Sequence, residues 1–294
     1  MKIVICSDGM PASDNAVRIG ALLAGPCRAE TTLLGITEKD GDEKPLREAL
    51  EKEAQVLRAA GISPEIVVRA GEPIMQIVDQ TANGQFDFAV IGARRKRSGG
   101  LYWHSDKTYE VIKAIAPPVL VAMGEVAQLK KFLVCTGGKQ YIEDAVKLTG
   151  RLAAAVGASV TLLHVMAEPP AIYADLVRLE EDVDALLQSN SELGRNLRAQ
   201  KESLDKLGVA ASVRLRHGFA LDQIFEELRD GEHDLIVAGS SQSRGPWRHY
   251  IMGDLTRRIL NGADCPVLIA RIGVGALAAQ GGAFGFLKRI FSAS

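Results

Sequence analysis

The hydrophobic positions of this chain form short continuous runs that alternate with longer segments of helical periodicity. The run from Leu235 to Ala238 is apolar without alternation, which is typical of a strand that is covered on both faces. Strands that alternate with amphipathic helices indicate βαβ units and a parallel sheet. We predict strands at residues 2–7, 31–36, 64–69, 87–92, 118–123, 131–136, 159–165, 211–216, 234–239 and 266–271.

The second half of the chain repeats the first. Three pairs of segments align: 2–6 (KIVIC) with 131–135 (KFLVC), 86–92 (FDFAVIG) with 233–239 (HDLIVAG), and 118–122 (PVLVA) with 266–270 (PVLIA). The offset is 129 residues at the first pair and 147 at the second, so the second copy holds 18 more residues ahead of Gly208. The chain is therefore predicted to be two copies of one unit.

The repeat predicts two domains, residues 1–126 and 127–272, followed by a tail of residues 273–294. The additional residues of the second copy lie in 175–207, where leucine and valine recur every three or four positions. That spacing predicts one long amphipathic helix, which we expect to cover the sheet or a neighbouring subunit. The tail is too short and too rich in glycine to span a membrane, so we expect no membrane contact from it.

The composition argues against several classes of binding partner, including nucleic acids and anionic membranes. The 35 Lys and Arg residues balance 36 Asp and Glu residues, so no overall field attracts nucleic acid or an anionic membrane. Aromatic residues make up 5% of the chain, which is little material for base stacking. The four cysteines form no CxxC pair, which argues against a zinc site or a disulfide framework. The first apolar run is too short for a signal peptide, and we expect a cytoplasmic protein.

Candidate chemistry lies at the carboxyl ends of the strands, where open parallel sheets bind ligands. Asp8 follows the first strand directly, and its carboxylate suits an adenine amino group or a ribose hydroxyl. Alternatively, Asp8 caps the helix that starts near Ser13 or shapes the turn with Gly9. The residues alone leave these interpretations open. In the second copy, a small-residue loop from Gly239 runs into a helix N-terminus, whose free N–H groups favour a phosphate.

The end of the second copy resembles the universal stress protein family, through residues 233–240, then 253–256 and 264–269. The first copy repeats these motifs more loosely, and the resemblance to a tandem member covers residues 1 to about 272. It implies an α/β fold of two doubly wound, five-stranded parallel sheets of order 3-2-1-4-5, Rossmann-like and related to the adenine-nucleotide alpha hydrolases. It also implies that residues 118–123 and 266–271 pair the copies as an intrachain pseudo-dimer, and it is compatible with a homodimer of the chain.

Some members of that family bind ATP. They use an Asp after the first strand, a residue of the second strand, and a Gly-x2-Gly-x9-Gly-Ser/Thr loop after the fourth strand. On this resemblance, the candidate residues are Asp8, Ile36, Gly92, Arg94 and Arg95 in the first copy, and Val165, Gly239, Ser240, Gly253 and Thr256 in the second.

Both copies depart from that pattern. Arg95 and Ser105 replace the second and third glycine of the loop in the first copy. In the second copy, Gly137 stands where the Asp is expected, Gln242 replaces the middle glycine and Asp254 replaces the Ser/Thr. The first copy therefore keeps the base side of the site, and the second keeps more of the phosphate side.

The replacements have electrostatic consequences. Asp106 and Asp254 each place a carboxylate at a helix N-terminus, where it is expected to satisfy the free N–H groups and to repel a phosphate. The basic run 94–97 offers cations that compensate in the first copy. We therefore expect at most one copy, preferably the first, to bind a nucleotide.

The resulting hypothesis is a cytoplasmic stress-response regulatory protein that binds ATP, ADP or AMP in one domain. Mg²⁺ is expected only as a companion of the nucleotide, and no other metal is predicted. The alternative is a scaffold or interaction protein with vestigial pockets that acts through oligomerisation. No nucleophile elbow, Walker lysine loop or zinc motif occurs in the sequence, so we expect no enzyme beyond a weak ATPase.

Overall fold

The computed structural model describes residues 1–10, 13–37, 43–93, 106–137, 142–167, 183–242 and 250–272. In the first half, strands and helices alternate as β1 (Lys2–Ser7), α1 (Asp14–Ala24), β2 (Glu30–Thr37), α2 (Glu43–Ala59), β3 (Glu65–Ala70), α3 (Pro73–Gly84), β4 (Phe88–Gly92), α4 (Asp106–Ala114) and β5 (Val119–Ala122). The second half consists of β6 (Lys131–Cys135), α5 (Glu143–Val156), β7 (Ser159–Met166), α7 (Val183–Gln188), α8 (Glu192–Asp205), β8 (Ala211–His217), α9 (Ala220–Asp230), β9 (Leu235–Gln242), β10 (Tyr250–Ile251), α10 (Asp254–Gly262) and β11 (Val267–Ile272). The tail at 273–294 lies outside the described residues.

All ten predicted strands are present, and most of their ends agree within one residue. The exception is β9, which continues to Gln242 because its end pairs with two neighbours. Ser241 is paired with Ile272 of β11 on one side, and Gln242 with Tyr250 of the short antiparallel β10 on the other. Residues 240–242 are polar, so a pattern of apolar residues does not predict that the strand continues through them.

The strands form one sheet of order β3-β2-β1-β4-β5-β11-β9-β6-β7-β8, with β10 attached to β9. When the strands are numbered within each half and counted inward from its outer edge, both halves have the order 3-2-1-4-5. Neighbouring strands within each half are parallel. The two halves meet at β5 and β11, whose antiparallel ladder sets Leu120 opposite Leu268. The sheet is thus continuous, but it consists of two doubly wound units joined through their last strands, and the predicted fold class is confirmed. The domain boundaries stay a prediction.

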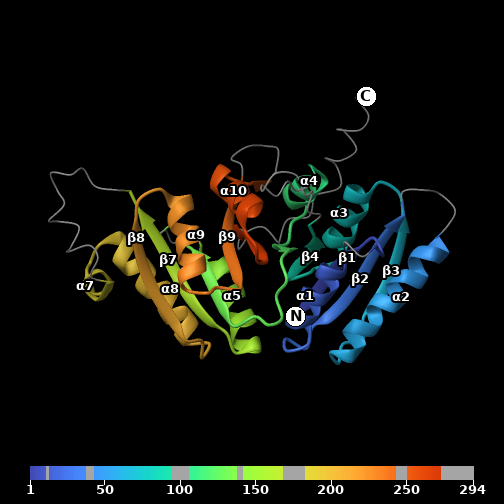
Figure 1. Ribbon diagram of the computed structural model, residues 1–294, viewed down its shortest axis with the longest axis horizontal. Helices are drawn as coiled ribbons and strands as arrows, with labels where there is room; N and C mark the ends of the chain where they lie inside the picture. The colour runs from blue at the N-terminus through green and yellow to red at the C-terminus, as the bar shows by residue number, and fades with distance from the viewer. Residues whose placement is uncertain are drawn as a thin grey trace.

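Helices cover both faces of this sheet (Figure 1). On one face α1 packs against α2 and α5 against α8, while α3 packs against α4 and α9 against α10 on the other. The strands between them are buried, with Ile3, Ile5, Phe88 and Phe132 fully inaccessible. None of the helices in the described ranges has the length and apolar character that crossing a bilayer requires.

The two halves repeat side-chain contacts as well as strand order. Asp87 Oδ2 accepts the Lys2 N–H at 2.7 Å, and Asp234 accepts the Lys131 N–H at 3.1 Å. Arg69 forms an ion pair with Asp79, and Arg216 forms its counterpart with Glu226 at 3.4 Å. The residues of each such pair of contacts differ by 147 in number, except Lys2 and Lys131, which differ by 129. These matches support duplication at the level of individual contacts.

The prediction of one long helix over 175–207 is wrong. The described part of this segment contains two helices, α7 and α8, separated at residues 189–191. Ser191 Oγ accepts the Gly194 N–H at 3.0 Å, and Ser189 Oγ accepts the Ser191 N–H at 3.3 Å. These side chains replace helical backbone bonds, so α7 ends and Ser191 caps a new helix. Residues 168–182 lie outside the described ranges.

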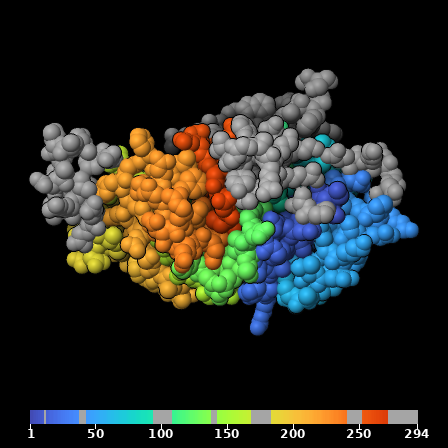
Figure 2. Space-filling view, in the orientation of Figure 1, coloured from blue at the N-terminus to red at the C-terminus, as the bar shows by residue number. Residues whose placement is uncertain are grey.

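The two halves lie side by side (Figure 2), and a buried arginine forms hydrogen bonds between them. Arg271 of β11 is 3% exposed. Its Nε donates to Pro117 O at 3.1 Å, and its Nη2 donates to Ile112 O at 2.5 Å and Ile115 O at 2.8 Å. These carbonyls belong to the end of α4 and the connection to β5, so one guanidinium of the second half satisfies the helix end of the first.

Candidate functional site

Each half has a point where the strand order reverses, between β1 and β4 in the first half and between β6 and β9 in the second. In the first half, Cys6 is paired with Ile91, so Asp8 after β1 and Gly92 at the end of β4 lie on neighbouring strands at the same edge. Ile36 lies at the carboxyl end of β2, one residue beyond the pairing of Ser7 with Gly35. Three of the predicted residues therefore lie at the carboxyl ends of the adjacent strands β2, β1 and β4, two of them at the topological switch point between β1 and β4.

Asp8 is exposed and belongs to a tight turn. Its Oδ1 accepts the Met10 N–H at 3.1 Å, and Gly9 has a φ of +69°, which favours glycine. A Cβ on Gly9 would lie 2.7 Å from Ala49 Cβ, so α2 packs directly against the turn. The residue at the N-cap of α1 is Ser13 rather than Asp8, and the Ser13 side chain forms no capping bond. Asp8 thus shapes the turn while presenting its carboxylate at the edge of the sheet.

A polar cluster that the sequence analysis missed lies beneath this turn. Ser7 Oγ lies 2.7 Å from Glu53 Oε1 of α2 and 2.8 Å from Ser13 Oγ, and it accepts the Gly9 N–H at 3.0 Å. Ser13 Oγ donates to Met10 O at 2.8 Å. Ser7 and Ser13 are both buried. No local pattern joins Ser7 to Glu53, but the offset of 147 that aligns Gly92 with Gly239 also aligns Glu53 with Gln200.

The environment of Glu53 disfavours its charge. Burial raises the pKa of the Glu53 carboxyl, the hydrogen bonds with Ser7 and Ser13 oppose this shift, and the negative charges of Asp14 and Asp8 add to it. Its second oxygen, Oε2, is buried without a hydrogen-bond partner among the described residues. The acid thus lies beneath the turn that carries Asp8, in an environment that shifts its ionisation toward the neutral form.

The remaining predicted residues of the first half are placed as follows. Ile36 and Gly92 are half-buried, and Gly92 is paired with Ala122 of β5. Arg94 and Arg95 lie outside the described residues.

In the second half, two of the predicted residues are half-buried near strand ends and two are buried. Val165 is half-buried near the end of β7, and Gly239 is half-buried in β9. Ser240 is buried; its hydroxyl donates to Ala270 O at 3.1 Å and accepts from Arg271 Nη1 at 3.2 Å. Thr256 is also buried, and it donates to Gly239 O at 2.9 Å, which ties α10 to β9. Ser240 and Thr256 therefore serve packing contacts.

The N-terminus of α10 differs from the prediction. Asp254 is the first residue of the helix, and the N-cap is Gly253, which has no side chain to form a capping bond. Asp254 therefore does not occupy the cap position. A Cβ on Gly253 would meet no atom within 4 Å, so this helix end is open to approach among the described residues. The Asp106 side chain lies outside the described part.

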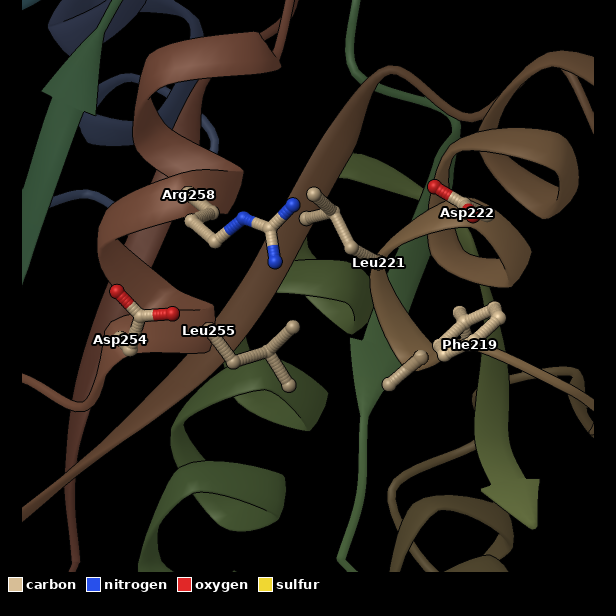
Figure 3. A pocket seen from close by; sticks show the side chains of 7 residues that line it. Phe219, Leu221, Asp222, Asp254, Leu255 and Arg258 are labelled. Carbon is tan, nitrogen blue, oxygen red and sulfur yellow. The ribbon is translucent and has the colours of Figure 1, made fainter. Parts of the chain in front are cut away.

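A pocket of about 310 Å³ lies beside Gly253, between the N-termini of α9 and α10 (Figure 3). Figure 3 shows the Arg258 guanidinium reaching from α10 into the gap, toward Leu221. Its lining combines apolar and charged side chains, namely Phe219, Ala220, Leu221, Asp222, Asp254, Leu255 and Arg258. Phe219 is 81% exposed at its rim. No local sequence pattern predicts this pocket, because its two walls come from different helices.

The pocket suits a polyphosphate less well than its helix ends suggest. Its lining contains two carboxylates, Asp222 and Asp254, and one cation, Arg258. Gly137, which occupies the position of Asp8 in this half, offers no carboxylate for a base. Of these two matching positions, only the one in the first half holds an acid, Asp8.

The structure offers few groups for metal or thiol chemistry. The described residues contain no cluster of three or more His, Cys, Asp or Glu side chains that could hold a metal ion. Burial raises the pKa of Cys6 and of Cys135, its counterpart in the second half, to about 12. At neutral pH both thiols are protonated and therefore poor nucleophiles.

The chain is similar to known proteins in sequence and in fold. The model of the Universal stress protein family matches residues 128–271. A universal stress protein from Archaeoglobus fulgidus DSM 4304 aligns with 92% of this chain and 98% of its own, at a TM-score of 0.66 and 16% identity. A protein of unknown function from Pseudomonas aeruginosa PAO1 aligns with 92% of both chains, at a TM-score of 0.63 and 17% identity. No curated protein sequence matches this chain.

At these identities, the two solved structures show a shared fold across both halves. The family match covers the second half, and the first half has the same strand order, 3-2-1-4-5. Residues 128–271 therefore form a domain of the universal stress protein family, and the first half repeats the fold of that domain in tandem.

Proposed function

We propose that this protein is a stress-response binding protein that takes one adenine nucleotide, ATP, ADP or AMP, at the carboxyl edge of its first half. The observation that carries the proposal is that Asp8, Ile36 and Gly92 lie at the carboxyl ends of the adjacent strands β1, β2 and β4. There the Asp8 carboxylate accepts hydrogen bonds from the adenine amino group or a ribose hydroxyl. Ile36 supplies an apolar surface for the base, and Gly92 allows the ligand to approach the backbone closely.

The basic run 94–97 begins two residues after Gly92 in the sequence and supplies cations for the phosphates, with Mg²⁺ as their companion. In the second half, Gly137 offers no carboxylate to a base, and Asp222 and Asp254 repel a polyphosphate. These differences favour one nucleotide per chain. The proposal is for binding and regulation rather than turnover.

The test is titration calorimetry with ATP, ADP and AMP on the wild type and on Asp8→Ala. Asp8→Ala removes a charged acceptor, so we expect affinity to fall by roughly 10- to 100-fold. Asp205→Ala makes the same substitution at an exposed Asp in the second half and serves as the control.

A third variant distinguishes the halves. Gly253→Ala adds a Cβ that meets no atom within 4 Å, so the fold tolerates it. A loss of affinity in Gly253→Ala with none in Asp8→Ala would move the site to the second half. Absence of binding by all three nucleotides would instead favour a scaffold that acts through oligomerisation.

A further inference from the structure

Three short oxygen–oxygen contacts connect α2 to the turn that carries Asp8. Glu53 Oε1 lies 2.7 Å from Ser7 Oγ, Ser7 Oγ lies 2.8 Å from Ser13 Oγ, and Ser13 Oγ lies 2.8 Å from Met10 O. All three distances are typical of O–H···O hydrogen bonds, each of which needs one proton between its two oxygens.

The number of protons available determines the state of Glu53. Each serine hydroxyl supplies one proton, and the Met10 carbonyl supplies none. Two protons serve only two of the three contacts, so all three are hydrogen bonds only when the Glu53 carboxyl is protonated. Glu53 then donates to Ser7, Ser7 to Ser13, and Ser13 to Met10 O, while Ser7 also accepts the Gly9 N–H. Ser13 Oγ also lies 3.4 Å from Glu53 Oε1, so an ionised Glu53 can accept from both hydroxyls, but one of the three short contacts is then left with lone pairs facing each other.

The second half supports a neutral group at this position. Gln200 of α8 aligns with Glu53, and Thr136 aligns with Ser7. Thr136 Oγ1 donates to Gln200 Oε1 at 3.1 Å, and both side chains are buried. An uncharged amide thus makes the equivalent contact between the second helix of the unit and the end of its first strand.

Two further observations favour the protonated acid. Glu53 Oε2 is buried and has no hydrogen-bond partner within the described ranges, which costs more for a carboxylate than for a carboxylic acid. The charged groups that act on Glu53 are Asp14 at the start of α1 and Asp8 in the turn, and both oppose its ionisation.

We infer that Glu53 is a positioning residue which, in its protonated form, holds the turn that presents Asp8 to a ligand. This inference rests on the proposed function of the first half. Ionisation of Glu53 breaks the chain of hydrogen bonds from α2 to Met10, the residue whose N–H binds the Asp8 carboxylate. Ligand affinity at Asp8 therefore falls as the pH rises through the pKa of Glu53.

The first test measures adenosine binding by calorimetry at about pH 5.5 and pH 8, because adenosine carries no phosphate that titrates in this range. The loss of one hydrogen bond to the turn predicts that the dissociation constant of the wild type rises about three- to tenfold between these values. Glu53→Gln is expected to bind about three- to tenfold more tightly than the wild type at pH 8, and its affinity to be independent of pH.

Glu51→Gln makes the same change on the exposed side of α2, where Glu51 pairs with Arg58, and is expected to keep the wild-type pH profile. An equal dissociation constant at both pH values in the wild type would overturn the inference. A pH profile that persists in Glu53→Gln would overturn it as well.

The second test does not need a ligand. A ¹³C carboxyl NMR titration, with the Glu53 signal identified by its loss in Glu53→Gln, is expected to give a midpoint above the ordinary value of about 4.3. The Gly9 amide shift is expected to follow the same midpoint. An ordinary midpoint, or a Gly9 amide that does not respond, would overturn the positioning role. A raised midpoint shared by Gly9, without any adenosine or ATP binding, would uphold that role and reject the proposed function instead.

Discussion

Glu53 and Gln200 occupy matching positions in the two halves, but only Glu53 can be ionised. Both contact a hydroxyl at the end of the first strand of their unit, Ser7 or Thr136. The first half thus combines an exposed acid, Asp8, with a partly buried acid beneath it. The second half has neither, because Gly137 and Gln200 replace them. This difference confines any effect of pH at these matching positions to the half for which nucleotide binding is proposed.

Stability is expected to depend on pH through Glu53. Because the pKa of Glu53 is raised in the folded state, its contribution to stability is complete below the unfolded value of about 4.3 and is lost as pH rises through the folded pKa. Glu53→Gln removes this loss. We therefore expect the melting temperature of Glu53→Gln to exceed that of the wild type by a margin that widens between about pH 5 and pH 8. A constant difference across this range would contradict the pKa shift.

At the scale of elements, the strands were predictable and the helix break was not. Buried parallel strands have continuous apolar runs, which the sequence displays directly, for example from Phe132 to Val134. The periodicity across 175–207 did not reveal that Ser189 and Ser191 bind backbone N–H groups and end α7. The contact between Ser7 and Glu53 was equally hidden, because 46 residues separate them.

The cap of α8 provides a test at this scale. Ser191→Ala removes the oxygen that accepts the Gly194 N–H, so we expect it to lower the free energy of unfolding by about 1 kcal/mol. Ser191→Asp keeps an acceptor at the same position and should restore most of that stability. Urea denaturation of both variants measures the difference. Equal destabilisation by Ala and Asp would show that the break between α7 and α8 does not depend on this cap.

The whole molecule is a duplicated unit whose halves have become different. Arg271 reaches from β11 to the carbonyls at the end of α4, whereas Met123 occupies its matching position in the first half. Tyr109 of α4 also donates a hydrogen bond to Asn261 of α10, and Arg257 lies over the Tyr109 ring at 5.0 Å. The two helices that follow the candidate phosphate loops therefore contact each other across the joint. The topology and the repeat were predictable from sequence, but these cross-half contacts were not, because each joins residues about 150 positions apart.

The number of nucleotides bound per chain tests the central claim most directly. Native mass spectrometry of the intact protein over a series of ATP concentrations counts them without assuming where they bind. Because only the first half keeps the acid at the switch point, we predict that the wild type saturates at one nucleotide per chain and that Asp8→Ala needs a higher ATP concentration to reach the same bound fraction. Saturation at two nucleotides per chain, or an unchanged bound fraction in Asp8→Ala at every concentration, would contradict the account.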